Sequence, residues 1–60
     1  MTELPELLRR RASDYEVLAA WHVERSTCDP GHRTAADALA AVAIVLREIA
    51  DAVEDERLAA

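Results

Sequence analysis

The sequence contains no lysine and no phenylalanine, and it has only one cysteine and one glycine among its 60 residues. Because Cys28 has no second cysteine to join, an internal disulfide is excluded. A chain this short buries only about 60% of the surface that its unfolded form exposes. Small folds of this kind depend on disulfides, metal ions or association for their stability. With the disulfide excluded, a metal ion or association remains.

Long apolar segments are also missing. No apolar run approaches the roughly 18 residues that a membrane span requires. Pro5, Glu6 and Arg9 interrupt the N-terminal segment, where a secretory signal would have an apolar core. We therefore expect a cytoplasmic protein with no membrane partner. All seven basic residues are arginine, and together with the many alanines this favours a GC-rich genome, such as that of an actinobacterium or its phage.

Positive charge is scarce as well, since the net charge is −5. Residues 34–60 carry six acids against two arginines, so most of the negative charge lies in the second half. Sequence-independent binding of nucleic acid needs the opposite sign, so we do not expect nucleic acid as a partner. A basic protein suits this charge better. The acidic stretch Asp51, Glu54, Asp55 and Glu56 resembles what a nucleic-acid mimic presents, although such a stretch is more often a solubilising helix end.

What the sequence has in abundance is alanine, leucine and charge, a composition typical of helices. We predict a first helix over about residues 3–27, with Thr2 as its cap and Pro5 tolerated in the first turn. At 100° per residue, one face of this segment is apolar from Leu4 to His22. Trp21 and Val23 lie at the margins of that face, and Val17 falls outside it.

A turn over residues 28–33 is predicted from Pro30 and Gly31, the usual centre of a type II turn. A second helix is predicted over about residues 34–58. Thr34 would cap this helix and Asp37, three residues later, would complete a capping box.

The second helix carries apolar residues with 3-4-3-4 spacing, which is the pattern of a helix-packing seam. A short connection makes the two helices antiparallel neighbours. The sequence therefore predicts an all-α, antiparallel two-helix hairpin, with Arg9, Arg10 and Arg11 beside Asp51, Glu54 and Asp55. The expected core and oligomer interface consists of Leu8, Tyr15, Leu18, His22, Leu39, Val42, Leu46, Ile49 and Val53.

Two helices touch along one line only, so stripes this wide leave apolar surface uncovered. We expect a homodimer that forms a four-helix bundle, because twofold symmetry is the commonest solution. Docking of the hairpin on a different protein is the alternative. Val17, Trp21 and Ile44 lie outside the seam, and they are the candidate partner surface.

His22, Cys28 and His32 are the only residues with soft-ligand chemistry, and they bracket the turn. Zinc requires four ligands, usually from paired motifs such as C-x2-C, whereas here there are three at unfamiliar spacing. The simpler interpretation is a half-buried histidine, an exposed thiol and a solvated histidine. We expect no metal and no cofactor, and these three residues are the candidates if that expectation fails.

Catalytic signatures are absent from the sequence. It has no glycine-rich phosphate loop and no nucleophile with a convincing base and orienting group. The sequence thus predicts a non-enzymatic interaction or regulatory module that acts as a homo-oligomer. Two alternatives remain: an acidic nucleic-acid mimic that binds a basic protein, and a metal or thiol sensor at His22, Cys28 and His32.

Overall fold

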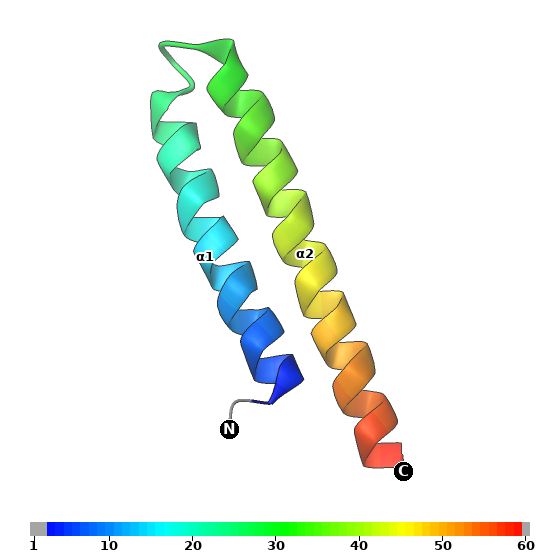
Figure 1. Ribbon diagram of the computed structural model, residues 1–60. Coiled ribbons are helices and arrows are strands. Elements are labelled where there is room, and N and C mark those ends of the chain that lie inside the picture. Colours follow the sequence, from blue (N-terminus) through cyan, green and yellow to red (C-terminus); the bar gives the residue numbers. More distant parts are fainter. Residues whose placement is uncertain (1–2, 60) are drawn as a thin grey trace.

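The computed structural model describes residues 3–59, and within them the chain forms two helices and one short loop. Helix α1 spans Leu4–Arg25 and helix α2 spans Pro30–Ala59. The helices lie side by side and run in opposite directions, with the loop at one end and both chain ends at the other (Figure 1). The prediction of an all-α, antiparallel two-helix hairpin is therefore confirmed.

Helix α1 begins with backbone contacts alone. Glu3 has an extended backbone, and its carbonyl accepts a hydrogen bond from the Leu7 N–H at 3.0 Å. Pro5 stands in the first turn, where its missing N–H costs no helical hydrogen bond. The predicted cap, Thr2, lies outside the described residues. The helix ends at Arg25, two residues earlier than predicted, and the hydroxyl of Ser26 donates to the Val23 carbonyl at 2.7 Å.

The predicted turn over residues 28–33 is wrong from residue 30 onward, because α2 begins at Pro30. Gly31 does not have the positive φ that a type II turn requires. Instead, the carboxylate of Asp29 accepts a hydrogen bond from the Gly31 N–H at 2.9 Å, as a helix cap does. Pro30 then occupies the first helical position, which suits its fixed φ. Thr34 consequently lies inside the helix and does not cap it.

The innermost layer between the helices consists of small residues at seven-residue spacing. Because a methyl side chain occupies little space, alanine at these positions allows the two backbones to approach closely. Seven residues correspond to two helical turns, so each series stays on one line of its helix. The buried residues are Pro5, Ala12 and Ala19 in α1, and Ala36, Ala43 and Ala50 in α2.

Ion pairs line one side of this alanine layer. Arg9 donates to Glu54 at 2.7 Å and to Asp51 at 2.8 Å. About two helical turns further along α1, Glu16 pairs with Arg47 of α2. Arg47 also donates to the Ser13 hydroxyl at 3.3 Å. We call this the ion-paired side; its residues are Arg9, Ser13, Glu16, Arg47, Asp51 and Glu54.

The large apolar side chains lie on the other side of the alanine layer. Leu46 follows Ala43 by three residues and so lies about 60° to one side of it, whereas Arg47 lies about 40° to the other. The same offsets relate Tyr15 and Glu16 to Ala12. We call this second surface the apolar face; its residues are Leu8, Tyr15, Leu18, Leu39, Val42, Leu46, Ile49 and Val53.

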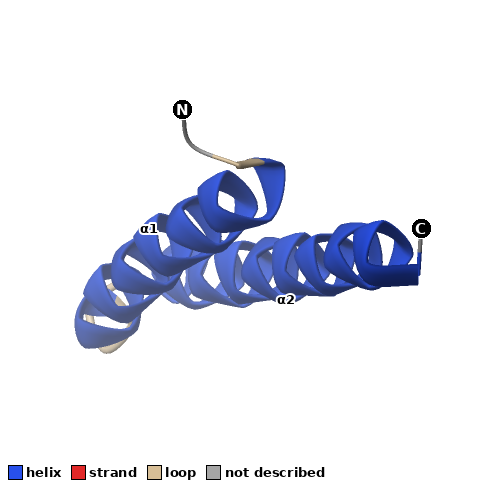
Figure 2. Ribbon diagram, turned by 90° about the horizontal axis from the view of Figure 1, so that it is seen from below, coloured by secondary structure: helices blue, strands red, loops and turns tan. Residues whose placement is uncertain are grey.

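The hairpin is one helix thick. Its extents are 50 × 19 × 10 Å. Its radius of gyration is 14.2 Å, whereas a compact 60-residue domain has about 10 Å. Viewed from below, the two helices again form a pair with nothing layered on them (Figure 2). No helix in residues 3–59 combines the length and the apolar character that crossing a membrane demands.

Candidate functional site: an apolar face and a histidine pair

The nine predicted interface residues fall into two groups according to how far their side chains are buried. Those that flank the alanine layer directly are half-buried, and the others are exposed by 43–48%. The half-buried residues are Leu8, Tyr15, His22, Leu39, Leu46 and Val53. The exposed residues are Leu18, Val42 and Ile49. At 100° per residue all nine lie on the same side of the hairpin, and the hairpin itself covers only one edge of the surface that they form.

Sequence reasoning missed the layer on which this surface rests. It did not recognise Ala36, Ala43 and Ala50 as the innermost contact, although their seven-residue spacing is visible in the sequence. The predicted leucine and valine seam is therefore one layer further out than expected.

Val17, Trp21 and Ile44 do not form one surface. Val17 and Ile44 lie on the outer, ion-paired half of their helices and are among the most exposed apolar side chains. Trp21 lies at the loop end of α1, where it contacts the two histidines. The predicted partner surface thus separates into two solvated aliphatic residues and one aromatic residue that belongs to a different cluster.

The exposed area of the chain can be compared with that of an ordinary folded monomer. The hairpin exposes 4512 Å², whereas a compact monomer of 6.6 kDa exposes roughly 3,900 Å². The excess is about 600 Å² per chain, and two copies that bury it against each other reach about 1,200 Å², where the range of stable specific interfaces begins.

The loop end holds a close pair of histidines. The Nδ1 atoms of His22 and His32 are 2.7 Å apart, within hydrogen-bond distance, and the ring centroids are 5.0 Å apart. Both residues are half-buried. When both rings are neutral, one Nδ1 must carry a proton and donate it, while the other accepts.

Trp21 closes the pair on one side. Its ring meets His22 edge-on at a centroid distance of 4.8 Å and His32 at 5.7 Å. Arg25 stacks on Trp21 with its guanidinium carbon 3.8 Å from the ring centroid, a cation–π contact. Trp21 is thereby held between a cation and two imidazoles, and its ring covers part of the histidine pair.

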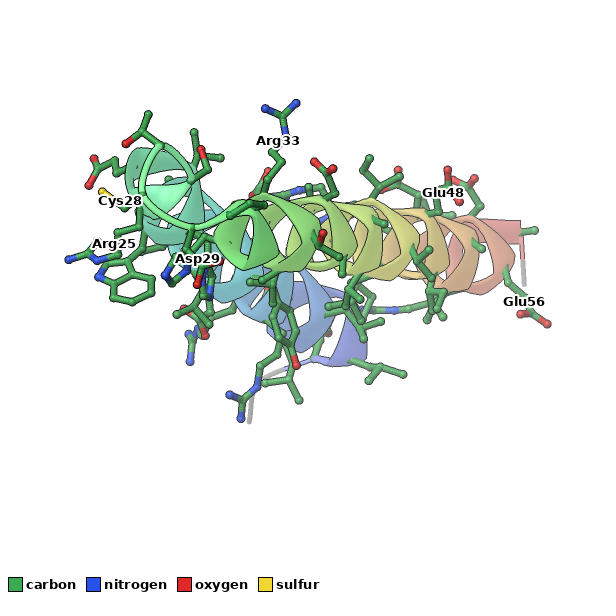
Figure 3. The ribbon with its side chains drawn as sticks, turned by 90° about the horizontal axis from the view of Figure 1, so that it is seen from above. Arg25, Cys28, Asp29, Arg33, Glu48 and Glu56 are labelled. Atoms are coloured by element: carbon green, nitrogen blue, oxygen red, sulfur yellow. The ribbon has the colours of Figure 1, made fainter. Side chains whose placement is uncertain are left out.

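Cys28 is exposed in the loop, and its thiol lies 3.9 Å from the Thr27 hydroxyl. Figure 3 shows Cys28 and Arg25 pointing outward at the loop end. Within residues 3–59 no three His, Cys, Asp or Glu side chains are placed to share a metal ion. Of the three candidate ligands, the structure therefore brings together His22 and His32, and not the cysteine.

The opposite end of the hairpin carries a shallow depression of about 290 Å³, lined by Glu3, Glu54, Arg57 and Leu58. Glu3 and Arg57 form an ion pair there. The hydrogen bond from Arg57 lowers the pKa of Glu3, and the same contact raises the pKa of Arg57. The third charged residue of the depression, Glu54, pairs with Arg9, so each charge there already has a partner within the chain.

The acidic stretch is not uniformly free. Asp51 and Glu54 are both engaged by Arg9, and their hydrogen bonds raise the pKa of that arginine. Asp55 and Glu56 are exposed, and Figure 3 shows Glu56 pointing away from the helix end. Half of the carboxylates that would imitate a nucleic acid are consequently used to join α1 to α2.

No known protein family, curated protein sequence or solved structure matches this chain.

Proposed function

We propose that this chain is a non-enzymatic interaction module that works as a homodimer, with two hairpins joined by their apolar faces into a four-helix bundle. The observation that carries the proposal is the division of the hairpin into two unlike sides. Ion pairs satisfy one side within the chain. On the other side, Leu18, Val42 and Ile49 remain 43–48% exposed without a second layer to cover them.

These features favour a second copy of the chain as the partner that covers the apolar face. Domains are normally built from two packed layers, and the 10 Å thickness of the hairpin corresponds to one. The excess area of about 600 Å² per chain is sufficient for a small twofold interface. A twofold axis would place each apolar face against its equivalent, so no new type of surface is needed.

The experiment compares two isoleucines on the same helix. Ile49 is 46% exposed on the apolar face, and Ile44 is 59% exposed on the other side. We expect sedimentation equilibrium of the parent protein to give twice the chain mass of 6.6 kDa. Ile49→Glu should shift the protein to monomer because it would bury an unpaired carboxylate, whereas Ile44→Glu should leave the dimer intact.

Two results would contradict the proposal. A parent protein that is a helical monomer at micromolar concentration would show that the apolar face needs no second copy. Equal weakening by Ile49→Glu and Ile44→Glu would place the contact elsewhere. Capture of the parent by a basic protein in a salt-sensitive manner, with the chain still monomeric, would instead favour the acidic mimic.

A further inference from the structure

We propose that α2 of one chain packs antiparallel against α2 of the second chain in the dimer, with the twofold axis beside Val45. The contact runs along residues of α2 that point away from α1. We call this surface the α2 edge; its residues are Ala38, Val42, Val45, Ile49 and Ala52. This arrangement rests on the proposed dimer, and it adds which helix of one chain meets which helix of the other.

The α2 edge has the residue spacing of a helix–helix contact. Its members are separated by four, three, four and three positions, the pattern of a line along which two helices pack. At about 100° per residue, they lie between about 100° and 180° from the line of Ala43, on the same side as Leu46. Helix α2 therefore carries two such lines, one that meets α1 and one that faces away from it.

The large side chains of the α2 edge are exposed in a row. Val42 is 43% exposed, Ile49 46% and Val45 50%. Ala38 and Ala52, one at each end, are exposed as well. A contiguous patch of exposed apolar side chains marks an interaction site, whereas single exposed side chains do not. Val42 and Ile49 also belong to the apolar face, so the α2 edge extends the surface that we propose to meet the second copy.

The corresponding line of α1 is interrupted by charge. It lies at similar angles from the line of Ala12, and its residues are Leu4, Leu7, Arg11, Asp14 and Leu18. Arg11 and Asp14 stand in the middle of this line and are exposed. Covering them closely with a second helix would remove two charged groups from water, which is costly unless each gains a partner. Close packing between the chains is therefore favoured on α2 rather than on α1.

Charge selects the antiparallel direction. Residues 30–44 of α2 carry one arginine and one aspartate, whereas residues 45–59 carry five acids and two arginines. A parallel contact would place the two acidic halves side by side, where they repel each other. An antiparallel contact places each acidic half beside the start of the other chain's α2, where the helix dipole is positive and the exposed Arg33 lies.

An axis beside Val45 pairs the α2 edge with itself. Val45 is the middle residue of the five, so a twofold rotation there brings Val45 of both chains together. Residue 38 then lies level with residue 52 of the other chain, and Val42 lies within one residue of the level of Ile49. Apolar side chains thus meet apolar side chains along the whole edge.

Cysteine cross-linking tests this contact, because a disulfide forms only between residues whose Cα atoms come within about 7 Å. Every variant carries Cys28→Ser, which removes the native thiol. Val45→Cys, treated with the thiol oxidant diamide, should run as a disulfide-linked dimer on a non-reducing gel. Ile44→Cys is the matched control and should stay a single chain. Ile44 adjoins Val45 but points about 100° away around the helix, and it is 59% exposed on the ion-paired half.

The direction is tested by mixing two variants, Ala38→Cys and Ala52→Cys, that are unfolded and refolded together. Because residue 38 of one chain lies level with residue 52 of the other, diamide should link the chains in the mixture and in neither variant alone. Linking of either variant alone would show a parallel contact and overturn the proposal. A mixture that stays unlinked would overturn it as well.

Sedimentation equilibrium of the reduced proteins separates this proposal from the dimer itself. If Val45→Cys is a dimer and stays unlinked, the α2 contact is overturned and the dimer stands. Linking of Leu18→Cys to Val42→Cys in a mixture would then place α1 against the other chain's α2. A monomeric parent would overturn both. If reduced Val45→Cys is monomeric although the parent is a dimer, the mixture of Ala38→Cys and Ala52→Cys decides, because those two substitutions are small.

Discussion

Arg9 and Glu54 face each other from the two helices, and the arginine Nη1 donates to the carboxylate Oε2 at 2.7 Å. This contact joins residues 45 positions apart in the sequence and fixes how far α2 runs beside α1. The sequence predicted Arg9 beside Asp51 and Glu54, and that part of the register is confirmed. Arg10 and Arg11 are exposed, because successive helical residues point about 100° apart.

Acid should weaken the hairpin at its open end through Glu3. The hydrogen bond from Arg57 lowers the pKa of Glu3, so the folded chain holds that proton less tightly than the unfolded chain. The stabilisation is fully present above the ordinary glutamate pKa of about 4.3 and is lost as the pH falls through the lower folded value. Glu3→Gln should therefore reduce the melting temperature at pH 7 and have no effect at pH 2.

High salt provides the control for this prediction. Glu3 and Arg57 are both solvent-exposed, so 1 M salt should screen their attraction, and the effect of Glu3→Gln at pH 7 should shrink. A Glu3→Gln effect of the same size at pH 2 and pH 7 would show that the carboxylate charge is not its cause. Circular dichroism melts at the two pH values make the comparison.

The start of α2 can be tested at Asp29 and Thr34. Asp29→Ala should destabilise the hairpin by about 1 kcal/mol, because it removes the acceptor for the Gly31 N–H. Thr34→Ala should be neutral or slightly stabilising, since Thr34 lies inside the helix and alanine has the higher helix propensity. Urea melts of both variants provide the measurement. If Thr34→Ala were instead the more destabilising of the two variants, Thr34 would be the helix cap, as the sequence suggested.

The turn shows why sequence alone located the break but not the helix start. Pro30 and Gly31 favour a type II turn and are equally compatible with the first turn of a helix. The choice depends on Asp29, which precedes Pro30 and satisfies the Gly31 N–H from its side chain. Asp37 three residues after Thr34 provided a competing capping signal, but in the structure Asp37 pairs with Arg33 instead.

The contact layer was hidden for a different reason. Burial predictions weigh side-chain size, so the larger Leu39 and Leu46 attract attention before Ala36 and Ala43. Close helix packing reverses that order, since only small residues fit on the line where the backbones meet. The histidine cluster was found in part, because a turn brings its flanking residues together, but side-chain direction at Cys28 could not be inferred from spacing.

Enlarging a buried alanine tests this layer directly. Ala43→Leu should destabilise the hairpin by about 1–3 kcal/mol. Ala43 is buried, and the space between the helices has no room for the three additional carbon atoms of leucine. Ala41→Leu is the matched control, since Ala41 is exposed on the same helix two residues away. Chemical denaturation should separate the two variants. Equal stability would mean that the helices are not closely packed at Ala43.

The last prediction concerns Leu46 and Ile44, two aliphatic residues on opposite sides of α2. Leu46 is half-buried beside the alanine layer, and in the proposed dimer the second hairpin would cover the rest of its side chain. Truncating a buried leucine typically costs 2–5 kcal/mol, comparable with the whole stability of so small a fold. Leu46→Ala should therefore dissociate the dimer and abolish cooperative thermal unfolding.

Ile44→Ala is the internal control for that result. Ile44 is 59% exposed on the ion-paired half of the helix, so its truncation should change stability by at most a few tenths of a kcal/mol. The two thermal melts should separate widely. If Ile44→Ala is as damaging as Leu46→Ala, a partner also covers the outer surface, and the assembly is larger than a four-helix dimer. Small effects at both positions would instead show that the apolar face contributes nothing to association.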